Sequence, residues 1–189
     1  MPGPPFLCGE TVDLHTVVEA DAEFIARGRN DPEVRPLLPR SRPHTVSEAR
    51  EDVEGYMSDD SEGLGLLACV DGDPIGLVSM FMVEVDSGRA FVAAWLVPEA
   101  QGKGYGTDTV GRLVEYGFDE RRFHRIGATA RADNDASRAT LETRIRSGGP
   151  PPRALLRRRD VRRPDHVRPA RIGVACGLTA GRRARPGRR

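Results

Sequence analysis

The stretch PEAQGKGYGTDTVGRLVEYGF, Pro98–Phe118, decides the fold because it joins a glycine-rich loop to an amphipathic helix. Its apolar residues recur at helical spacing after the loop: Val110, Leu113, Val114 and Phe118. The apolar run GRAFVAAWLV before it predicts a strand that ends at Pro98, which cannot donate to a sheet ladder. A strand, a glycine loop and a helix N-terminus together favour anion binding, because helical N–H groups are unpaired there and glycines let a phosphate approach.

The glycine spacing argues against two common nucleotide sites. The loop lacks the Gly-Lys-Ser/Thr ending of an ATP-binding P-loop, and Gly102-x-Gly104-x-Gly106 is not the dinucleotide pattern Gly-x-Gly-x-x-Gly. What remains is Gln101-x-x-Gly104-x-Gly106. This pattern resembles the pyrophosphate loop, Gln/Arg-x-x-Gly-x-Gly/Ala, of the acetyl-CoA-dependent N-acetyltransferases of the GNAT superfamily.

The segments before the loop predict a first strand, two helices and a hairpin. TVDLHTV, beginning at Thr11, alternates like a half-buried strand, and EADAEFIARGRNDPEVRPLL predicts a helix with Ala22, Ile25 and Ala26 on one face. TVSEAREDVEGYM has the spacing of a capping box between Thr45 and Glu48. The apolar stripe expected on this second helix is Val46, Ala49, Val53 and Tyr56. LGLLACV and PIGLVSMFMVEV, joined by Asp-Gly-Asp, indicate a β-hairpin.

The resemblance extends over about residues 9 to 143. VDGDPIGLVSM is similar to the family's second-to-third strand hairpin, and RIGATARADNDASRATLE to its fifth strand and following helix. Asn134-x-x-Ser137 and the two helices after the first strand are most similar to the branch that acetylates protein N-termini, including ribosomal-protein alanines. The implied fold class is α/β (α+β), with a mixed, largely antiparallel central sheet flanked by helices and lacking its last strands.

The resemblance also implies acetyl-CoA as cofactor and a set of binding residues. The backbone N–H groups expected to hold the pyrophosphate belong to Gln101, Gly102, Lys103, Gly104, Tyr105, Gly106 and Thr107. Lys103 is a candidate charge partner of the phosphates. Leu96 and Val97 are expected to pair with the pantetheine arm like an added strand, and Asn134 to orient the last helix or the cofactor arm.

Two residues are candidates for catalysis. Ser137 lies where the N-terminal-acetylating branch has a serine proposed to assist, although a serine at a helix N-terminus also serves as a cap. Glu84 lies on a strand expected to face the acceptor, either as a base or as a solvated carboxylate. The tyrosine acid of many family members has no counterpart, since no tyrosine follows Tyr116. The histidines show no pattern of paired carboxylates in the sequence, so a catalytic histidine is not expected: His15, His44 and His124.

The composition changes abruptly at Arg144. From there to the last residue, fifteen arginines face only Asp160 and Asp165, a net charge of about +13, whereas the first 143 residues carry about −12 and predict an acidic surface. We divide the chain into an acetyltransferase-like domain, 1–143, and an Arg/Pro/Gly-rich segment, 144–189, which is disordered or frameshifted. The alternatives are a nucleic-acid-binding tail, divergence to a disordered end, and a shifted reading frame, which we favour because one allowed out-of-phase translation resembles the family's closing turn and strands.

The expected activity is transfer of an acetyl group to a primary amine, with a protein N-terminus favoured and a small polyamine or amino-sugar next. The alternative is a non-catalytic acyl-CoA-binding or RNA-associated protein that uses its basic tail; nucleic acid is an expected partner only if that tail is genuine. Three distant cysteines without metal-ligand spacing predict a reducing compartment and no metal. The lack of a membrane-length apolar run or a signal peptide predicts a cytoplasmic protein.

Overall fold

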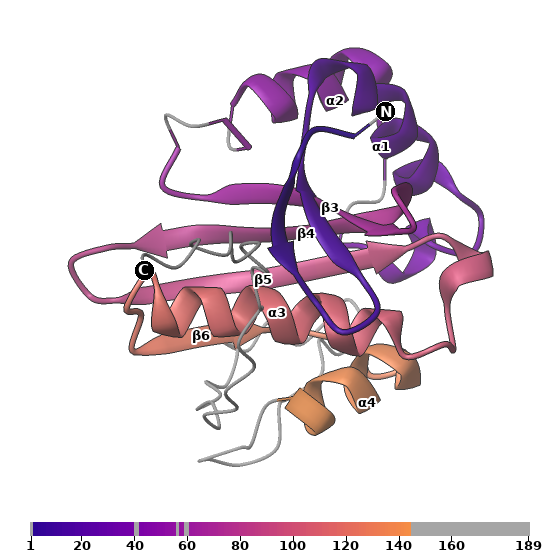
Figure 1. Ribbon diagram of the computed structural model, residues 1–189. Helices are drawn as coiled ribbons and strands as arrows, with labels where there is room; N and C mark the ends of the chain where they lie inside the picture. The colour runs from indigo at the N-terminus through magenta and orange to yellow at the C-terminus, as the bar shows by residue number, and fades with distance from the viewer. Residues whose placement is uncertain (1, 40–41, 56, 59–60, 145–189) are drawn as a thin grey trace, which may run out of the picture.

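The computed structural model describes residues 2–39, 42–55, 57–58 and 61–144 (Figure 1). The strands are β1 Pro5–Cys8, β2 Asp13–Thr16, β3 Leu64–Val70, β4 Asp73–Glu84, β5 Arg89–Leu96 and β6 Arg125–Ala128. The helices are α1 Ala22–Asn30, α2 Val46–Glu54, α3 Tyr105–Asp119 and α4 Asp135–Arg144, with short 3₁₀ turns η1 Glu19–Asp21, η2 Arg35–Leu37 and η3 Pro98–Ala100. The predictions for Tyr56 and for 145–189 lie outside the described residues.

The strands form one sheet in the order β1-β2-β3-β4-β5-β6, antiparallel except for the parallel pair β5–β6. The predicted mixed, largely antiparallel sheet flanked by helices is therefore confirmed. The predicted hairpin is confirmed as β3 and β4, and its two-residue turn places Asp71 and Gly72 at positive φ, as a tight hairpin turn requires. The strand expected first is β2, and β1 precedes it.

Helices cover both faces of the sheet, as Figure 1 shows. Odd-numbered strand residues such as Leu67, Leu77 and Trp95 pack with α1 and α2. Even-numbered ones such as Val78 and Val92 pack with α3 and the end of α4. The alternation of side chains along a strand thus gives two separate cores, one for each helical layer.

The helix patterns are confirmed with one exception. Ala22, Ile25 and Ala26 of α1 are buried, and Thr45 and Glu48 form the expected capping box at the start of α2. In α2, Ala49 is buried and Val53 packs on the core beside α1, but Val46 is exposed. The prediction for Val46 was wrong because this residue occupies the first helical position, at the rim of the interface rather than within it.

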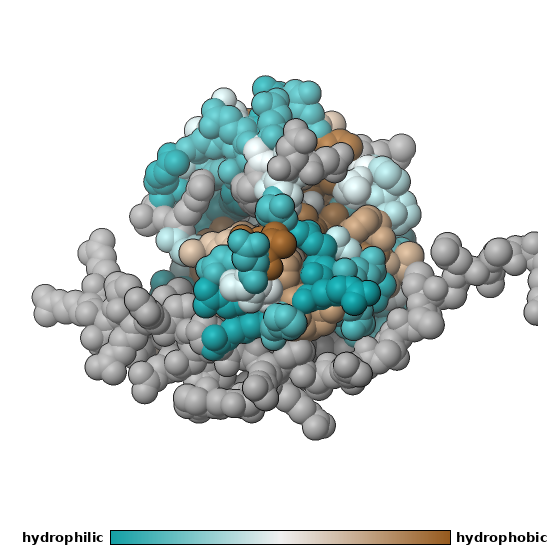
Figure 2. All heavy atoms as spheres, turned by 90° about the vertical axis from the view of Figure 1, so that its left-hand side faces the viewer, coloured by the Kyte–Doolittle hydropathy of each residue, from teal (hydrophilic) through white to brown (hydrophobic). Residues whose placement is uncertain are grey.

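The described helices include none long and apolar enough to cross a membrane. The far end of the sheet, at the β4–β5 connection, exposes Met82 and Val85. Figure 2 views the molecule from this end and shows a small apolar area among hydrophilic side chains. β4 is irregular here, between Phe81 and Glu84, with Met82 at positive φ.

A buried carboxylate ties the N-terminal hairpin to the start of α3. Asp108 accepts hydrogen bonds from the backbone N–H groups of Glu10, Thr11 and Val12, at 3.2, 2.7 and 2.9 Å, and from the Thr11 hydroxyl at 3.0 Å. Burial raises the pKa of this carboxyl, but the hydrogen bonds outweigh burial, so the pKa lies below its ordinary value. The interaction joins residues about a hundred positions apart and holds the helix that follows the glycine loop.

Replacement of this carboxylate should destabilise the fold. We expect Asp108→Ala to lower the free energy of unfolding by about 3 kcal/mol, because several N–H groups lose a charged acceptor. Asp119→Ala, an exposed control in the last turn of the same helix, should change it by less than about 0.5 kcal/mol. Urea denaturation of both variants measures the difference, and equal effects would contradict the assignment.

The same contact predicts a pH dependence. Since the pKa of Asp108 is lower in the folded than in the unfolded chain, its carboxylate stabilises the fold above the ordinary pKa, about 4. This contribution is lost as the pH falls through the lower folded value. The stability advantage of the parent over Asp108→Asn, measured in urea, should therefore be largest near neutral pH and shrink in acid. An advantage independent of pH would argue against the depressed pKa.

Candidate active site

The glycine loop connects η3 to α3 through two residues in the left-handed region. Gly102 has φ +73° and Gly104, the N-cap of α3, has φ +85°. A Cβ at either position would meet no atom within 4 Å, so the backbone conformation, rather than lack of space, requires glycine. The loop is exposed from Gln101 to Gly104.

The expected row of free N–H groups is shorter than the sequence suggested. The N–H of Gln101 donates to the Pro98 carbonyl at 3.1 Å, and that of Thr107 to the Gly104 carbonyl at 3.0 Å. The N–H groups from Gly102 to Gly106 make no hydrogen bond within the described residues. These five groups at the positive end of a helix fit a pyrophosphate. Lys103, at the centre of the loop, is exposed and makes no ion pair in this part of the chain.

The edge of β5 next to the loop carries backbone groups that point away from β4. Val97 donates to the Ile75 carbonyl at 2.9 Å and accepts from Ala100 at 3.0 Å, so its backbone is already used. Because antiparallel strands alternate, the N–H and C=O groups of Leu96 and Ala94 face the β6 side instead. β6 pairs only as far as Ala128 with Val92, so those groups lie beyond its paired end.

This register changes the predicted pair for a pantetheine arm. Leu96 keeps its role, with its carbonyl accepting a hydrogen bond from the Gln101 amide at 3.0 Å and its N–H facing the gap. The structure places Val97 on the wrong side for pairing, toward β4, and puts Ala94 on the edge in its place. The sequence could have suggested Ala94 only through the alternation of the strand.

The N-terminal half of α4 lies beside the loop. Asn134 caps this helix, accepting the Ser137 N–H at 2.9 Å through its side-chain oxygen, which explains the Asn-x-x-Ser spacing. Thr140 borders the first turn of α3, since a Cβ on Gly106 would lie 3.9 Å from its hydroxyl and 3.6 Å from the Leu96 side chain. Ser137 is one turn before Thr140 on the same face of α4. Sequence reasoning named Ser137 and missed Thr140.

The structure does not bring Glu84 to this group. Glu84 lies at the opposite end of β4–β5 from the glycine loop (Figure 1), where it pairs with Arg89. Hydrogen bonds from Ser87 and Arg89 lower the pKa of its exposed carboxyl, which makes it a weaker base. A general-base role for Glu84 is therefore unsupported by its position and by its electrostatics.

A cavity of about 320 Å³ lies on the other face of the sheet. Its wall over β4 and β5 is apolar except for Ser79, and it carries further polar groups where α1 and the segment before α2 meet it. It is lined by Arg29, Leu38, Pro39, Arg42, His44, Leu77, Ser79, Phe81, Ala93, Ala94 and Trp95. Because Ala94 also contributes the free strand edge, the cavity adjoins the place where the β5–β6 pairing ends.

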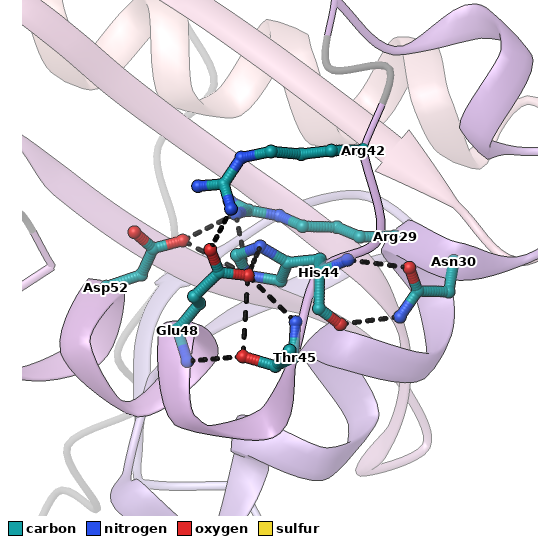
Figure 3. Close-up of polar contacts among 7 residues, drawn as sticks. All are labelled: Arg29, Asn30, Arg42, His44, Thr45, Glu48 and Asp52. Atoms are coloured by element: carbon teal, nitrogen blue, oxygen red, sulfur yellow. Dashed lines mark hydrogen bonds and ion pairs between the residues drawn. The ribbon is translucent and has the colours of Figure 1, made fainter.

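A polar cluster, drawn in Figure 3, includes three of the residues that line this cavity: Arg29, Arg42 and His44. His44 is buried, and its Nε2 lies 3.3 Å from Asp52 Oδ2 and 3.2 Å from Arg29 Nη1, while its Nδ1 lies 3.7 Å from Glu48 Oε2. Asn30 fixes the backbone of His44, donating to its carbonyl at 2.6 Å and accepting its N–H at 2.8 Å.

The prediction that the histidines have no paired carboxylates is thus wrong for His44. His44, Glu48 and Asp52 are spaced four residues apart, which places them in one column along the start of α2. That spacing was the available signal, and it was missed because His44 lies just outside the helix.

Elsewhere in the described chain, burial and the nearby acid Asp21 raise the pKa of Cys69 to about 12, so its thiol is no nucleophile near neutral pH.

The site therefore combines an exposed glycine loop, the part of the β5 edge beyond the paired end of β6, and a cavity beside that edge. A sequence model described as an acetyltransferase (GNAT) domain matches residues 12–143. The chain belongs to the GNAT acetyltransferase family. The match ends one residue before the change in composition at Arg144.

Known relatives agree with this assignment. The putative ribosomal N-acetyltransferase YdaF of Bacillus subtilis (strain 168) is 29% identical over 83 residues, 44% of this chain and 45% of YdaF. Among solved structures, Mycobacterium smegmatis RimJ in complex with CoA-disulfide has a TM-score of 0.67 and 23% identity over 78% of this chain and 79% of its own. Spermidine N-acetyltransferase from Vibrio cholerae, in complex with CoA and spermine, has a TM-score of 0.64 and 19% identity, covering 70% and 79%. The two structures show a shared fold.

Two neighbouring glycines should respond differently to alanine. Gly104→Ala forces a side chain into the left-handed region, at a cost of about 1–2 kcal/mol, and should weaken CoA binding about tenfold by moving the free N–H groups. Gly106→Ala meets only ordinary contacts and should leave affinity within about twofold, with a stability gain of up to about 1 kcal/mol from helix propensity. Isothermal titration with CoA tests the pair. Equal losses of CoA affinity in the two variants would show that CoA binding does not depend on the left-handed backbone conformation at Gly104.

Proposed function

We propose that the protein transfers the acetyl group of acetyl-CoA to a primary amine, with a protein N-terminus as the favoured acceptor. The observation that carries the proposal is the run of five N–H groups at Gly102–Gly106 that have no hydrogen bond within the described residues. They lie beside the part of the β5 edge, at Ala94 and Leu96, that extends beyond the paired end of β6. A phosphate-binding loop continuous with a strand edge suits a cofactor that has a pyrophosphate and an amide-containing arm.

In this proposal each part of the site has one task. Bound acetyl-CoA supplies the acetyl group as an activated thioester. The loop N–H groups hold its phosphates, with Lys103 as a charge partner, and the β5 edge directs its arm toward Ala94. The cavity lined by His44, Ser79 and Trp95 receives the acceptor amine from the opposite face of the sheet. Direct transfer needs no covalent bond to the protein, and Ser137 assists by exchanging a proton.

The protein N-terminus is supported by the name of YdaF, a ribosomal N-acetyltransferase, and by the Asn134-x-x-Ser137 pattern. A small polyamine, as suggested by the spermidine N-acetyltransferase neighbour, or an amino-sugar is the second choice. Release of free CoA thiol by the purified chain, measured with acetyl-CoA and a peptide that has a free N-terminal alanine, tests transfer. No release above that seen with an N-terminally blocked peptide would contradict it.

Substitution of Ser137 should separate catalysis from binding. We expect Ser137→Ala to lower kcat at least about tenfold with little change in CoA affinity, because the Asn134 cap uses the backbone N–H of residue 137 rather than the hydroxyl. Glu84→Gln should leave kcat unchanged, since that residue lies at the other end of the strands. Steady-state kinetics of both variants test these roles. A loss of kcat in Glu84→Gln alone would contradict the role of Ser137 and favour Glu84 instead.

A second candidate function follows from the charge of residues 144–189. Their net charge of about +13 favours binding to the phosphate backbone of a nucleic acid. An RNA-associated acyl-CoA-binding protein is therefore the alternative. Steeply salt-dependent RNA binding without acetyl transfer would favour it over the enzyme.

We also propose that the reading frame shifts near codon 144. The end of the family match at Thr143 and the abrupt onset of arginine support this proposal. Resequencing codons 138 to 150 from the source DNA tests it. A one-base insertion or two-base deletion is expected, and an intact frame would make the arginine-rich segment part of the native protein.

A further inference from the structure

The charges around the cavity are unevenly placed. Its charged lining, within the described residues, consists of the guanidinium groups of Arg29 and Arg42, and the imidazole of His44 lies beside them. The nearby carboxylates belong to Asp52 and Glu48, which are not among the lining residues. Arg29 pairs with Asp52, and Arg42 pairs with Glu48 (Figure 3). Among the described lining residues, the charged groups that an entering molecule meets are therefore the two arginines, each already paired with one carboxylate.

The two arginines differ in exposure. The Arg29 side chain is 15% exposed and held by Asp52 and His44, so it forms a fixed part of the wall. The Arg42 side chain is 67% exposed, on the segment that leads into α2. Arg42 is thus the charged group at the rim of the cavity, where it can contact the acceptor residues that follow the first one.

The remaining lining residues of the cavity are apolar except for Ser79. Leu38, Leu77, Phe81 and Trp95 line it, together with the small residues Ala93 and Ala94. A compact apolar side chain next to the reactive amine fits such a floor. A polyamine fits less well, because its additional ammonium groups would face guanidinium groups, and no carboxylate of the described residues lines the cavity to pair with them.

We propose that this cavity selects a peptide N-terminus whose first residue is small and uncharged and whose following residues are acidic, and that Arg42 determines this preference. The inference rests on the proposed function, because it takes the cavity as the acceptor site. Arg42 contacts the acidic residues of the acceptor, and the apolar floor takes the first side chain. Polyamines and peptides with basic residues after the first are excluded by charge.

Trp95 allows a test of binding that is independent of turnover. It is the only tryptophan of the chain and it lines the cavity, so its fluorescence reports occupation of this site. The full-length protein with bound CoA is titrated with spermidine and with three peptides that begin with two alanines and continue with glutamates, serines or lysines. The comparison is repeated for Arg42→Gln and Arg42→Glu. Arg50→Glu is the control, since Arg50 is an exposed arginine of α2 that does not line the cavity.

We expect the glutamate peptide to bind most tightly and the lysine peptide and spermidine most weakly. Arg42→Gln should weaken binding of the glutamate peptide about three- to fivefold, which is the effect of losing one partly exposed ion pair. Arg42→Glu should reverse the order of the peptide affinities. Arg50→Glu should keep the parent's order. The arginine-rich segment after Thr143 attracts any acidic peptide. Because the parent and all variants share this segment, the conclusion rests on the difference in peptide affinity between them.

The outcomes are distinguishable. Spermidine or the lysine peptide binding as tightly as the glutamate peptide, an order unchanged by Arg42→Glu, or no fluorescence response to any of them would each overturn the proposal. If the expected order of binding holds but no peptide is acetylated when acetyl-CoA replaces CoA, charge selection at the cavity stands and the proposed transfer fails.

Discussion

The hydrogen-bond register between β4 and β5 is the constraint on which the site depends. Val97 donates to Ile75, and by alternation this bond commits every second residue of β5 to β4 and turns Leu96 and Ala94 toward the opposite edge. A slip of one residue would exchange the two sets and move Trp95 from the α1 face to the α3 face. One register therefore fixes the free strand edge, the lining of the cavity and the separation of the two cores.

The glycine loop takes its geometry from contacts on both sides. Gln101 binds the end of β5 through Leu96, and Asp108 anchors the start of α3 to the N-terminal hairpin. Between these two fixed points the chain turns through Gly102 and Gly104 at positive φ and leaves its N–H groups unpaired within the described residues. The loop is thus held open by structure outside it, which reduces the ordering cost of binding an anion.

Most of the fold could be predicted because its signals are local. The helical spacing of α3, the capping box of α2 and the Asp-Gly turn of the β3–β4 hairpin each lie within a few residues. The glycine loop before α3 could be predicted for the same reason. Ala94 and Thr140 were missed because their positions beside the loop result from pairing and packing between distant segments. The spacing of His44 to Glu48 and Asp52 is local, but His44 lies just outside α2, and its contact with Arg29 joins distant segments. Asp108 was missed as well, since its partners lie near residue 11, far along the sequence.

The most direct test of this account is an amide NMR titration of the isotope-labelled protein with CoA. The account predicts that the largest amide shift changes fall on Gly102–Gly106, with further changes at Ala94 and Leu96, whose N–H groups face the cofactor side. Val97 should change little, because its N–H is bonded to Ile75. Large changes at Val97 with none at Ala94, or changes that avoid the glycine loop, would contradict the claim that the β4–β5 register builds the cofactor site.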